Sequence, residues 1–446
     1  MKSNKLITLS IACVVLAALA GTLYWSNRHP KSAYPAASAT VSPTILNINP
    51  ADVTAFTIKT KDAPPVTLAR DANQAWQITA PKPMHADPEQ VSILLSALEP
   101  LAAQEVVTNS ASDLSQYGLT SPTIEIDLTQ KGRPDQRLLI GDNTPVGSAS
   151  YAMVAGNPRI FTTFSSANTT FNKTANDLRD KRLITLNADQ MNRIELVRNG
   201  TTMALDRTAR GWALEKPAPY RTDSMAADGL ASALADAQMQ ATQPSEKVAQ
   251  AAFANATPVA TVKVTGASGT QTIEVRKGNT SDYVKSSVVP GIYQADPTLG
   301  DSLAKSVDEF RNKQLFDFSN SGPDAIDVVF ADPKPLSVNM VHNAQGWWRD
   351  GRKMDADTVE SFISGFRDLT ATKFATSGFT TPMIVATVTS NGGKRVEKVE
   401  IAKVKEGKSG SEYLARRTND PSLYVLDAGA VEGIESAAAA LHPASK

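Results

Sequence analysis

The segment Trp76–Asp87 reads WQITAPKPMHAD, and related segments recur at Trp212–Asp223 (WALEKPAPYRTD) and Trp347–Asp355 (WWRDGRKMD). Each segment places a tryptophan on a short strand and ends on an aspartate that precedes a helical pattern. The tryptophans are 136 and 135 residues apart. A nearly fixed interval of this length indicates tandem copies of one domain-sized unit.

The same order of features continues beyond these segments. In every copy a proline opens a β-rich run and a tyrosine leads a later strand: Pro122, Pro258 and Pro382; Tyr151, Tyr283 and Tyr413. The first two copies close with DLRDK at Asp177–Lys181 and EFRNK at Glu309–Lys313. The third copy ends in a helical pattern around 431–441, and we expect it to lack this closing element. We therefore expect three repeats, at 45–184, 185–316 and 317–446.

Strand patterns dominate each repeat. Ile124–Leu128 (IEIDL), for example, alternates apolar with acidic residues, as a half-buried strand does. A helical pattern follows each aspartate, at 88–101, 224–238 and 356–369. Short connections between the strands favour hairpins. The predicted fold class is therefore α+β, with a mainly antiparallel sheet and one or two helices in each repeat.

The first residues predict a membrane anchor. Residues 6–25 form an uncharged, mainly apolar run of 20 residues, the length that a helix needs to cross a bilayer. Lys2 and Lys5 precede the run and favour a cytoplasmic N-terminus, although two basic residues also follow it. We therefore expect residues 1–25 to be a single-pass signal anchor in the inner membrane, with residues 26–446 in the periplasm.

Two alternatives for this segment remain open. Ala18-Leu19-Ala20 fits a signal-peptide cleavage site, and Cys13 invites comparison with a lipoprotein, although it lies in the middle of the apolar run. Residues 26–44 are rich in Ser, Ala and Pro and predict a linker. Residues 26–446 contain no cysteine, which suits an oxidising compartment.

Composition narrows the classes of function. The 446 residues are 41% hydrophobic, enough for packed cores, and 45 Lys and Arg balance 45 Asp and Glu. This neutrality argues against binding of nucleic acid. Four His, one Cys and an isolated S-x-x-K at Ser302–Lys305 form no recognisable catalytic or metal-binding set. We predict no catalytic residue, no cofactor and no metal, so the chain is not expected to be an enzyme.

The recurring residues have a structural and a functional interpretation. Asp87, Asp223 and Asp355 invite a catalytic or metal-binding role, but their positions favour helix capping. The recurring tryptophans suit a shared core position better than a sugar-binding platform. Trp348 occurs only in the third repeat, beside Trp347, and neighbouring strand residues point to opposite faces. Trp348 is therefore a candidate partner-contact residue.

Basic residues mark the ends of the first two repeats. They are Arg179 and Lys181 at the first boundary, and Arg311 and Lys313 at the second. A salt bridge that locks neighbouring domains is the preferred interpretation. The alternative is a docking surface for a partner, so these four residues are also candidate partner contacts.

Motifs of the first repeat resemble a known family. YGLTSP at Tyr117–Pro122, LLIGDNTPVG at Leu138–Gly147 and DLRDK at Asp177–Lys181 are similar to the bacterial domain-of-unknown-function family 4340. The resemblance is strongest over residues 50–185 and weaker in the later repeats. It implies an anchored envelope protein, often encoded beside ABC-transporter components of the gliding-motility auxiliary type. No functional residues are established for the family, so none carry over.

These observations favour a non-catalytic scaffold or auxiliary subunit of an envelope or ABC-transporter complex. The expected partners are the inner membrane, through residues 6–25, and proteins of a membrane complex. A periplasmic ligand-binding module, for example for a glycan, is the alternative, and a hydrolase is less favoured.

Overall fold

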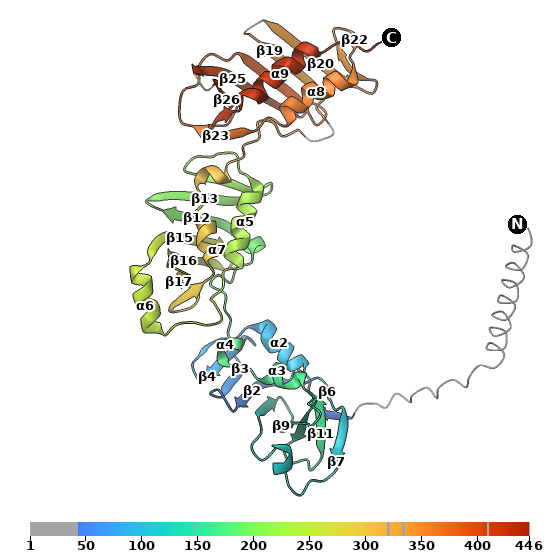
Figure 1. The fold of residues 1–446 in the computed structure, drawn as a ribbon, viewed down its shortest axis with the longest axis vertical. Helices are drawn as coiled ribbons and strands as arrows, with labels where there is room; N and C mark the ends of the chain where they lie inside the picture. The colour runs from blue at the N-terminus through green and yellow to red at the C-terminus, as the bar shows by residue number, and fades with distance from the viewer. Residues whose placement is uncertain (1–42, 148, 319–321, 332–334, 408–409, 446) are drawn as a thin grey trace, which may run out of the picture. The chain divides into compact units, whose positions relative to one another are not determined.

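The computed structural model describes residues 43–445, except 148, 319–321, 332–334 and 408–409. The predicted anchor at 1–25 and most of the predicted linker lie outside this range. Within it, no helix has both the length and the apolar character that a membrane crossing requires. The chain divides into two compact units, one ending at Asp180 and one beginning at Lys181. The first unit holds one repeat and the second holds two (Figure 1).

The first unit is built on a nine-stranded antiparallel sheet in the order β5-β4-β3-β2-β8-β9-β10-β11-β7, and β1 pairs separately with β6. Its elements are β1 (Thr44–Leu46), β2 (Val53–Thr60), β3 (Val66–Arg70), β4 (Trp76–Ala80), β5 (Met84–His85), α2 (Pro88–Ser96), β6 (Leu101–Ala102), β7 (Glu105–Thr108), η1 (Ser115–Tyr117), β8 (Ile124–Gln130), β9 (Gln136–Asn143), β10 (Ala149–Val154), β11 (Ile160–Phe164), α3 (Ser166–Phe171) and α4 (Ala175–Leu178).

The second repeat has a seven-stranded sheet in the order β14-β13-β12-β15-β16-β17-β18. Its elements are η2 (Ala188–Gln190), β12 (Met191–Arg198), β13 (Thr201–Thr208), β14 (Gly211–Lys216), α5 (Ser224–Ala235), α6 (Glu246–Asn255), β15 (Thr257–Gly266), β16 (Gly269–Lys277), β17 (Asp282–Ser286), β18 (Ile292–Ala295), α7 (Pro297–Leu303) and η3 (Val307–Phe310).

The third repeat again has nine strands, in the order β22-β21-β20-β19-β24-β25-β26-β27-β23. Its elements are β19 (Ala325–Phe330), β20 (Leu336–Asn343), β21 (Gly346–Arg349), β22 (Arg352–Lys353), α8 (Ala356–Arg367), β23 (Ala371–Ala375), β24 (Ile384–Ser390), β25 (Arg395–Gly407), β26 (Gly410–Arg417), β27 (Leu423–Leu426) and α9 (Ala428–Ala440). The strand order matches that of the first repeat position by position. The predicted antiparallel α+β architecture is therefore confirmed for the described residues.

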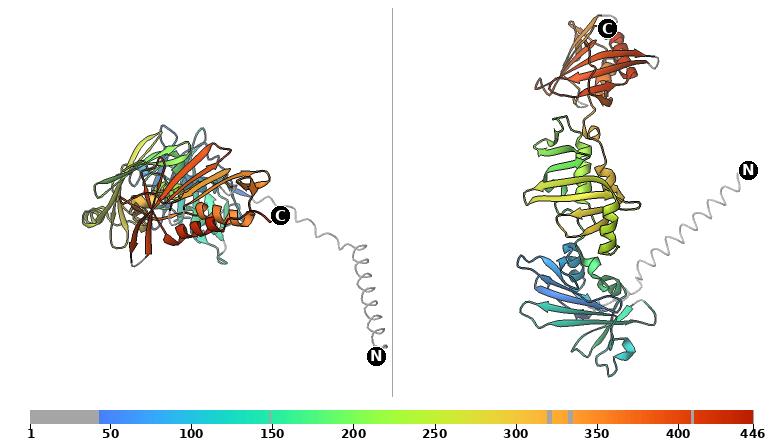
Figure 2. Two further views of the ribbon diagram at one scale, coloured as in Figure 1. Left: turned by 90° about the horizontal axis from the view of Figure 1, so that it is seen from above. Right: turned by 90° about the vertical axis from the view of Figure 1, so that its left-hand side faces the viewer.

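The alternation of apolar and polar residues along the strands explains why each sheet has one buried face. In β8, Ile124, Ile126 and Leu128 are at most 2% exposed, while Glu125 and Asp127 point to the other face. The helices of each repeat cover the apolar face of its sheet. In the third repeat α8 and α9 share one core with β19, β20 and β24 (Figures 1 and 2). Each repeat thus has its own hydrophobic core.

The three recurring aspartates are helix caps. The Asp87 side chain accepts hydrogen bonds from the Glu89 and Gln90 amides at the start of α2. Asp223 and Asp355 cap α5 and α8 in the same way. A cap of this kind contributes about 1 kcal/mol.

Core membership moves both repeat boundaries upstream of the expected positions. Leu183 and Ile184 are fully buried in the second core, so they belong to the second repeat and not, as predicted, to the first. Leu315 and Phe316 likewise lie in the third core. The boundaries predicted at 184 and 316 were therefore wrong by a few residues, because motif ends do not report which core a side chain enters.

The expectation that the third repeat lacks a closing element was wrong for the backbone. In the first repeat the Asp87 amide donates to Leu178, and in the second the Asp223 amide donates to Phe310, both at 2.8 Å. In the third repeat the Asp355 amide donates to His442 at 3.0 Å. Backbone pairing needs no particular side chain, so the closing element survives without its sequence motif.

Candidate functional site at the junction of the second and third repeats

One segment, Arg311–Leu315, follows η3 and joins the second repeat to the third, and we call it the connecting strand. Its first half pairs with the second repeat: the Asn312 amide donates to the Arg221 carbonyl at 2.8 Å. Its second half pairs with the third repeat, where the Leu315 amide donates to Leu369 at 3.0 Å. The connecting strand is therefore hydrogen-bonded to both repeats.

Arg311 lies at the centre of this junction and is only 7% exposed. Its guanidinium group stacks on Tyr220 of the second repeat at 3.9 Å and on Phe374 of the third at 3.5 Å from the ring centres. Arg311 Nη1 also contacts the Asp308 carboxylate at 2.8 Å. A desolvated cation between two rings gains about 2 kcal/mol or more from such contacts.

A second group of charges, which we call the junction network, lies beside Arg311. It is formed by Arg221, Asp317, Arg395, Glu397 and Arg417. Glu397 is 5% exposed, and its Oε1 lies 2.7 Å from Arg417 Nη2 and 3.2 Å from Arg395 Nη2. Asp317 pairs with Arg395 at 2.7 Å and with Arg221 of the second repeat.

Tyr424, on β27, is hydrogen-bonded to the junction network. Its hydroxyl donates to Asp420 and accepts a hydrogen bond from Arg221 at 3.3 Å. Burial, together with the hydrogen bond to Asp420, raises the pKa of Tyr424 to about 12. The Tyr424 ring also lies 5.4 Å from Phe374, so the junction network and the Arg311 stack are in contact.

Of the other residues predicted as partner contacts, Lys313 lies on the connecting strand, whereas Arg179, Lys181 and Trp348 lie away from this junction. Arg179 forms a backbone bridge with Ala86 in the first unit, and Lys181 accepts a backbone hydrogen bond from Met239 in the second. Lys313 accepts one from Ala371 at 2.9 Å. Trp348 lies apart from the junction, on β21. The Trp348 side chain is half-buried and donates to Asn343 at 3.1 Å.

The recurring tryptophans sit under basic or aromatic side chains that the sequence reasoning missed. Arg70 stacks over Trp76 at 4.6 Å and Arg207 over Trp212 at 4.5 Å, and His342 lies 5.0 Å from Trp347. Trp76 and Trp212 are buried, and Trp347 packs against the third core. The covering residue precedes each tryptophan by five or six positions, a spacing that was visible in the sequence.

One carboxyl group of the second repeat is buried without full hydrogen bonding. Asp282 is fully buried, and its Oδ2 accepts from the Gly300 amide at 2.7 Å, while its Oδ1 has no partner. The corresponding serine of the first repeat, Ser150, is instead hydrogen-bonded to Asn143 and Asn168. Burial raises the pKa of Asp282 above its ordinary value.

This raised pKa predicts a pH-dependent stability. The folded chain holds the Asp282 proton more tightly than the unfolded chain, so this contribution is full at low pH and is lost as pH rises through the folded pKa. We expect Asp282→Asn to become more stable relative to the wild type as pH rises from about 4 to about 7. Urea unfolding at several pH values measures this difference. Asp228→Asn on the exposed face of α5 is the control, and a difference independent of pH would contradict the prediction.

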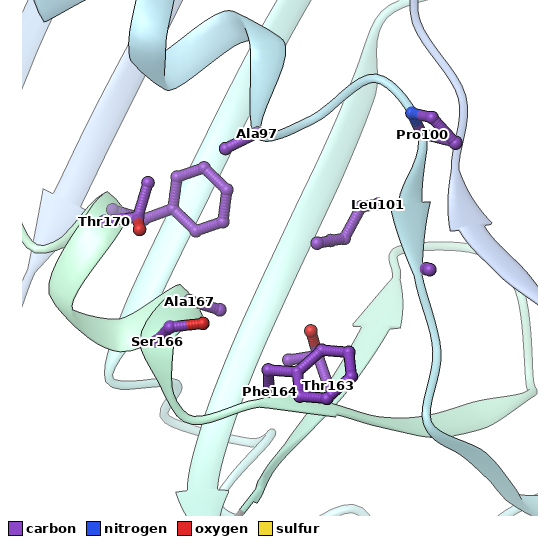
Figure 3. A pocket seen from close by; sticks show the side chains of 10 residues that line it. Ala97, Pro100, Leu101, Thr163, Phe164, Ser166, Ala167 and Thr170 are labelled. Atoms are coloured by element: carbon purple, nitrogen blue, oxygen red, sulfur yellow. The ribbon is translucent and has the colours of Figure 1, made fainter.

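Two hollows lie on the surface of single repeats. One of about 230 Å³ lies in the first repeat between α2, β6, β11 and α3, where Leu101 and Ala167 face one another (Figure 3). Another of about 500 Å³ lies in the second repeat beside Arg198, Lys277 and Pro258. Over the part of the chain that the structure describes, His, Cys, Asp and Glu form no group of three or more suited to a metal ion.

Comparison with known proteins identifies one family. The family model described as "Domain of unknown function (DUF4340)" matches residues 76–242 and 212–387, which together cover most of the chain. The chain belongs to this family. The two matches begin at Trp76 and Trp212, so the DUF4340 copies follow the tryptophan interval. Each match also includes one boundary between repeats, and the second contains the whole connecting strand. Searches of curated proteins and of solved structures found no match.

Proposed function

We propose that this DUF4340 protein is a non-catalytic, membrane-anchored scaffold or auxiliary subunit of an envelope transport complex. The single observation that carries the proposal is the connecting strand, which is hydrogen-bonded to two successive repeats and holds Arg311 between their aromatic rings. Residues at the domain boundary are thus used to fix neighbouring domains to one another.

The charged residues of the junction suit a structural role, in which they join two domains, better than a catalytic role. Three arginines pair with the carboxylates of Glu397 and Asp317, and Glu397 also accepts a hydrogen bond from the Asp317 amide. A scaffold needs fixed domain spacing, and the junction provides it for the second and third repeats. The predicted anchor at residues 6–25 would hold this array at the inner membrane, with residues 26–446 in the periplasm.

Proximity labelling in intact cells tests the proposal. A labelling enzyme fused after Lys446 is expected to mark the subunits of a membrane transport complex. The matched control carries a cleavable signal peptide in place of residues 1–25, which should release the protein and lose the labelling. Recovery of no membrane complex by the full-length fusion would contradict the scaffold role.

A ligand-binding role is the second candidate, and the hollow of the first repeat favours it. Phe164 lines this hollow and is 55% exposed, which is unusual for a phenylalanine on a strand. An apolar ligand or the apolar face of a sugar would suit it. Binding of a glycan library that is lost in Phe164→Ser, but not in a variant of the exposed Val146 (Val146→Ser), would support this candidate.

A further inference from the structure

The third sheet carries an exposed apolar face on the side away from α8 and α9. Inward-facing residues such as Ile326, Val328 and Val388 enter the core with these helices. The alternate residues face outward. Among them Val329, Val341 and Val396 are each at least 50% exposed.

Strand register arranges these outward residues in rows across the sheet. The first row runs Trp348, Val341, Ala325, Thr389 and Val396, each paired with the next on the neighbouring strand. A second apolar pair, Val329 and Val385, lies two rows away on β19 and β24. Between them is a polar row of Asn339, Asp327, Thr387 and Lys398. We call these three rows the outer face.

The second repeat shows that this apolar row is not required by the fold. At the corresponding positions it carries Ala213, Asp206, Arg193, Thr265 and Thr270. Arg193 and Asp206 form an ion pair at 2.5 Å, where the third repeat has Ala325 and Val341. The first repeat has Gln77, Ala69, Ala55 and Thr129 there. Trp348 and two valines are thus peculiar to the third sheet.

The register of the outer face makes it self-complementary. Consider two copies packed face to face about a two-fold axis that runs parallel to the strands, between β19 and β24. Such an axis places β19 opposite β24 of the other copy, and β20 opposite β25, without changing the row. Val341 then faces Val396, and Val329 faces Val385, so the valines of both outer rows meet valines. At the edge of the second of these rows Ser337 faces Glu400, whose carboxylate is paired with Arg416 of its own chain.

The polar row is compatible with the same arrangement. Asn339 faces Lys398 of the second copy, and Asp327 faces Thr387. Lys398 pairs with Glu400 of its own chain at 3.1 Å and lies one strand, about 4.8 Å, to the side of Asp327 of the other copy, so its charge is balanced in this arrangement. Two sheets stack about 10 Å apart with their strands nearly aligned, as in β-sandwiches.

We propose that the outer face of the third repeat binds a second copy of this chain through an isologous, sheet-on-sheet contact. This inference is independent of the proposed scaffold role. An interface of this type uses one patch on both subunits, as two-fold symmetry requires.

Sedimentation of the full-length protein in mild detergent, over a range of concentrations, tests the inference. The wild type is expected to form dimers. The double variant Ala325→Arg/Val341→Asp copies the ion pair that the second repeat already accommodates at Arg193 and Asp206, so it should fold yet weaken dimerisation at least tenfold. Val248→Asp, at an exposed valine on α6, is the matched control and should dimerise like the wild type.

Cross-linking tests the axis itself. In a Cys13→Ser background, a short bis-maleimide should join V341C chains to V396C chains when the two are mixed. V341C chains alone should not cross-link, because their cysteines would lie three strands, about 14 Å, apart across the axis. A wild type that is monomeric at all concentrations, a double variant that dimerises normally, or cross-links between V341C chains alone would each overturn the proposal.

Discussion

Replacing Glu397 by alanine is expected to lower the free energy of unfolding of the third repeat by about 3 to 5 kcal/mol. Glu397 is 5% exposed and accepts from Arg417, Arg395 and the Asp317 amide. Removing it leaves Arg417, which is itself almost buried, with only the more distant Asp317 carboxylate at 3.7 Å. Taking the closest partner from a buried charge costs more than the intact pair contributes, so the loss exceeds the value of one salt bridge.

Urea unfolding measures this effect, and hydrogen exchange of the amides in the third repeat monitors the loss of its structure. Arg416→Ala is the matched control, because Arg416 pairs with Glu400 on the same two strands but is about half exposed. Exposed pairs contribute at most about 1 kcal/mol, so this control should be nearly neutral. Equal losses for the two variants would show that burial of the junction network does not set its energetic importance.

The recurring pattern of the sequence predicted the repeat architecture because it reports local constraints. An aspartate before a helix, a tryptophan on a strand and an alternating IEIDL segment each describe a few neighbouring residues. Asp223 caps α5 and Trp212 is buried, as expected. Such features repeat with the chain and so can be recognised without knowledge of tertiary contacts.

The junction network could not be predicted in the same way. Asp317 and Glu397 are 80 residues apart in sequence, and Arg221 is further still from both Glu397 and Tyr424. At the first boundary Thr185 and Gln271 take the places of Asp317 and Glu397, and the Thr185 amide donates to Gln271 at 2.8 Å. Neither of these two residues is charged, so the residue types did not mark the network as recurring. Arg311 was selected from the sequence, but its two ring contacts come from different repeats, and a salt bridge was expected where stacking dominates.

The apolar row of the third sheet could be predicted from the sequence only in part. Trp348 was recognised because it has no equivalent in the other repeats. Its alignment with Val341 and Val396 depends on the register of five strands, and a shift of one residue would turn these side chains to the other face. Sequence alone therefore pointed to one residue of a surface that only the pairing of strands defines.

Arg311→Ala is expected to separate the second and third repeats as cooperative units. The substitution removes the cation between Tyr220 and Phe374 and leaves Asp308 without its partner. We expect a loss of about 3 kcal/mol, because both stacking faces are desolvated. The amides of Asn312 and Leu315, which tie the connecting strand to its two repeats, should then exchange faster, and trypsin should cleave more readily after Lys313.

Arg276→Ala distinguishes loss of the junction from general weakening. Arg276 stacks over Phe253 at 4.4 Å within the second repeat, so its removal destabilises one repeat without touching the connecting strand. Cleavage after Lys313 should therefore stay slow in this variant. The double-mutant cycle of Arg311→Ala with Phe374→Ala isolates the contact between repeats, and a coupling energy near zero would mean that Arg311 stabilises only its own repeat. A clear coupling, together with selective exposure of Lys313, is the result expected if one buried guanidinium group joins two otherwise complete domains.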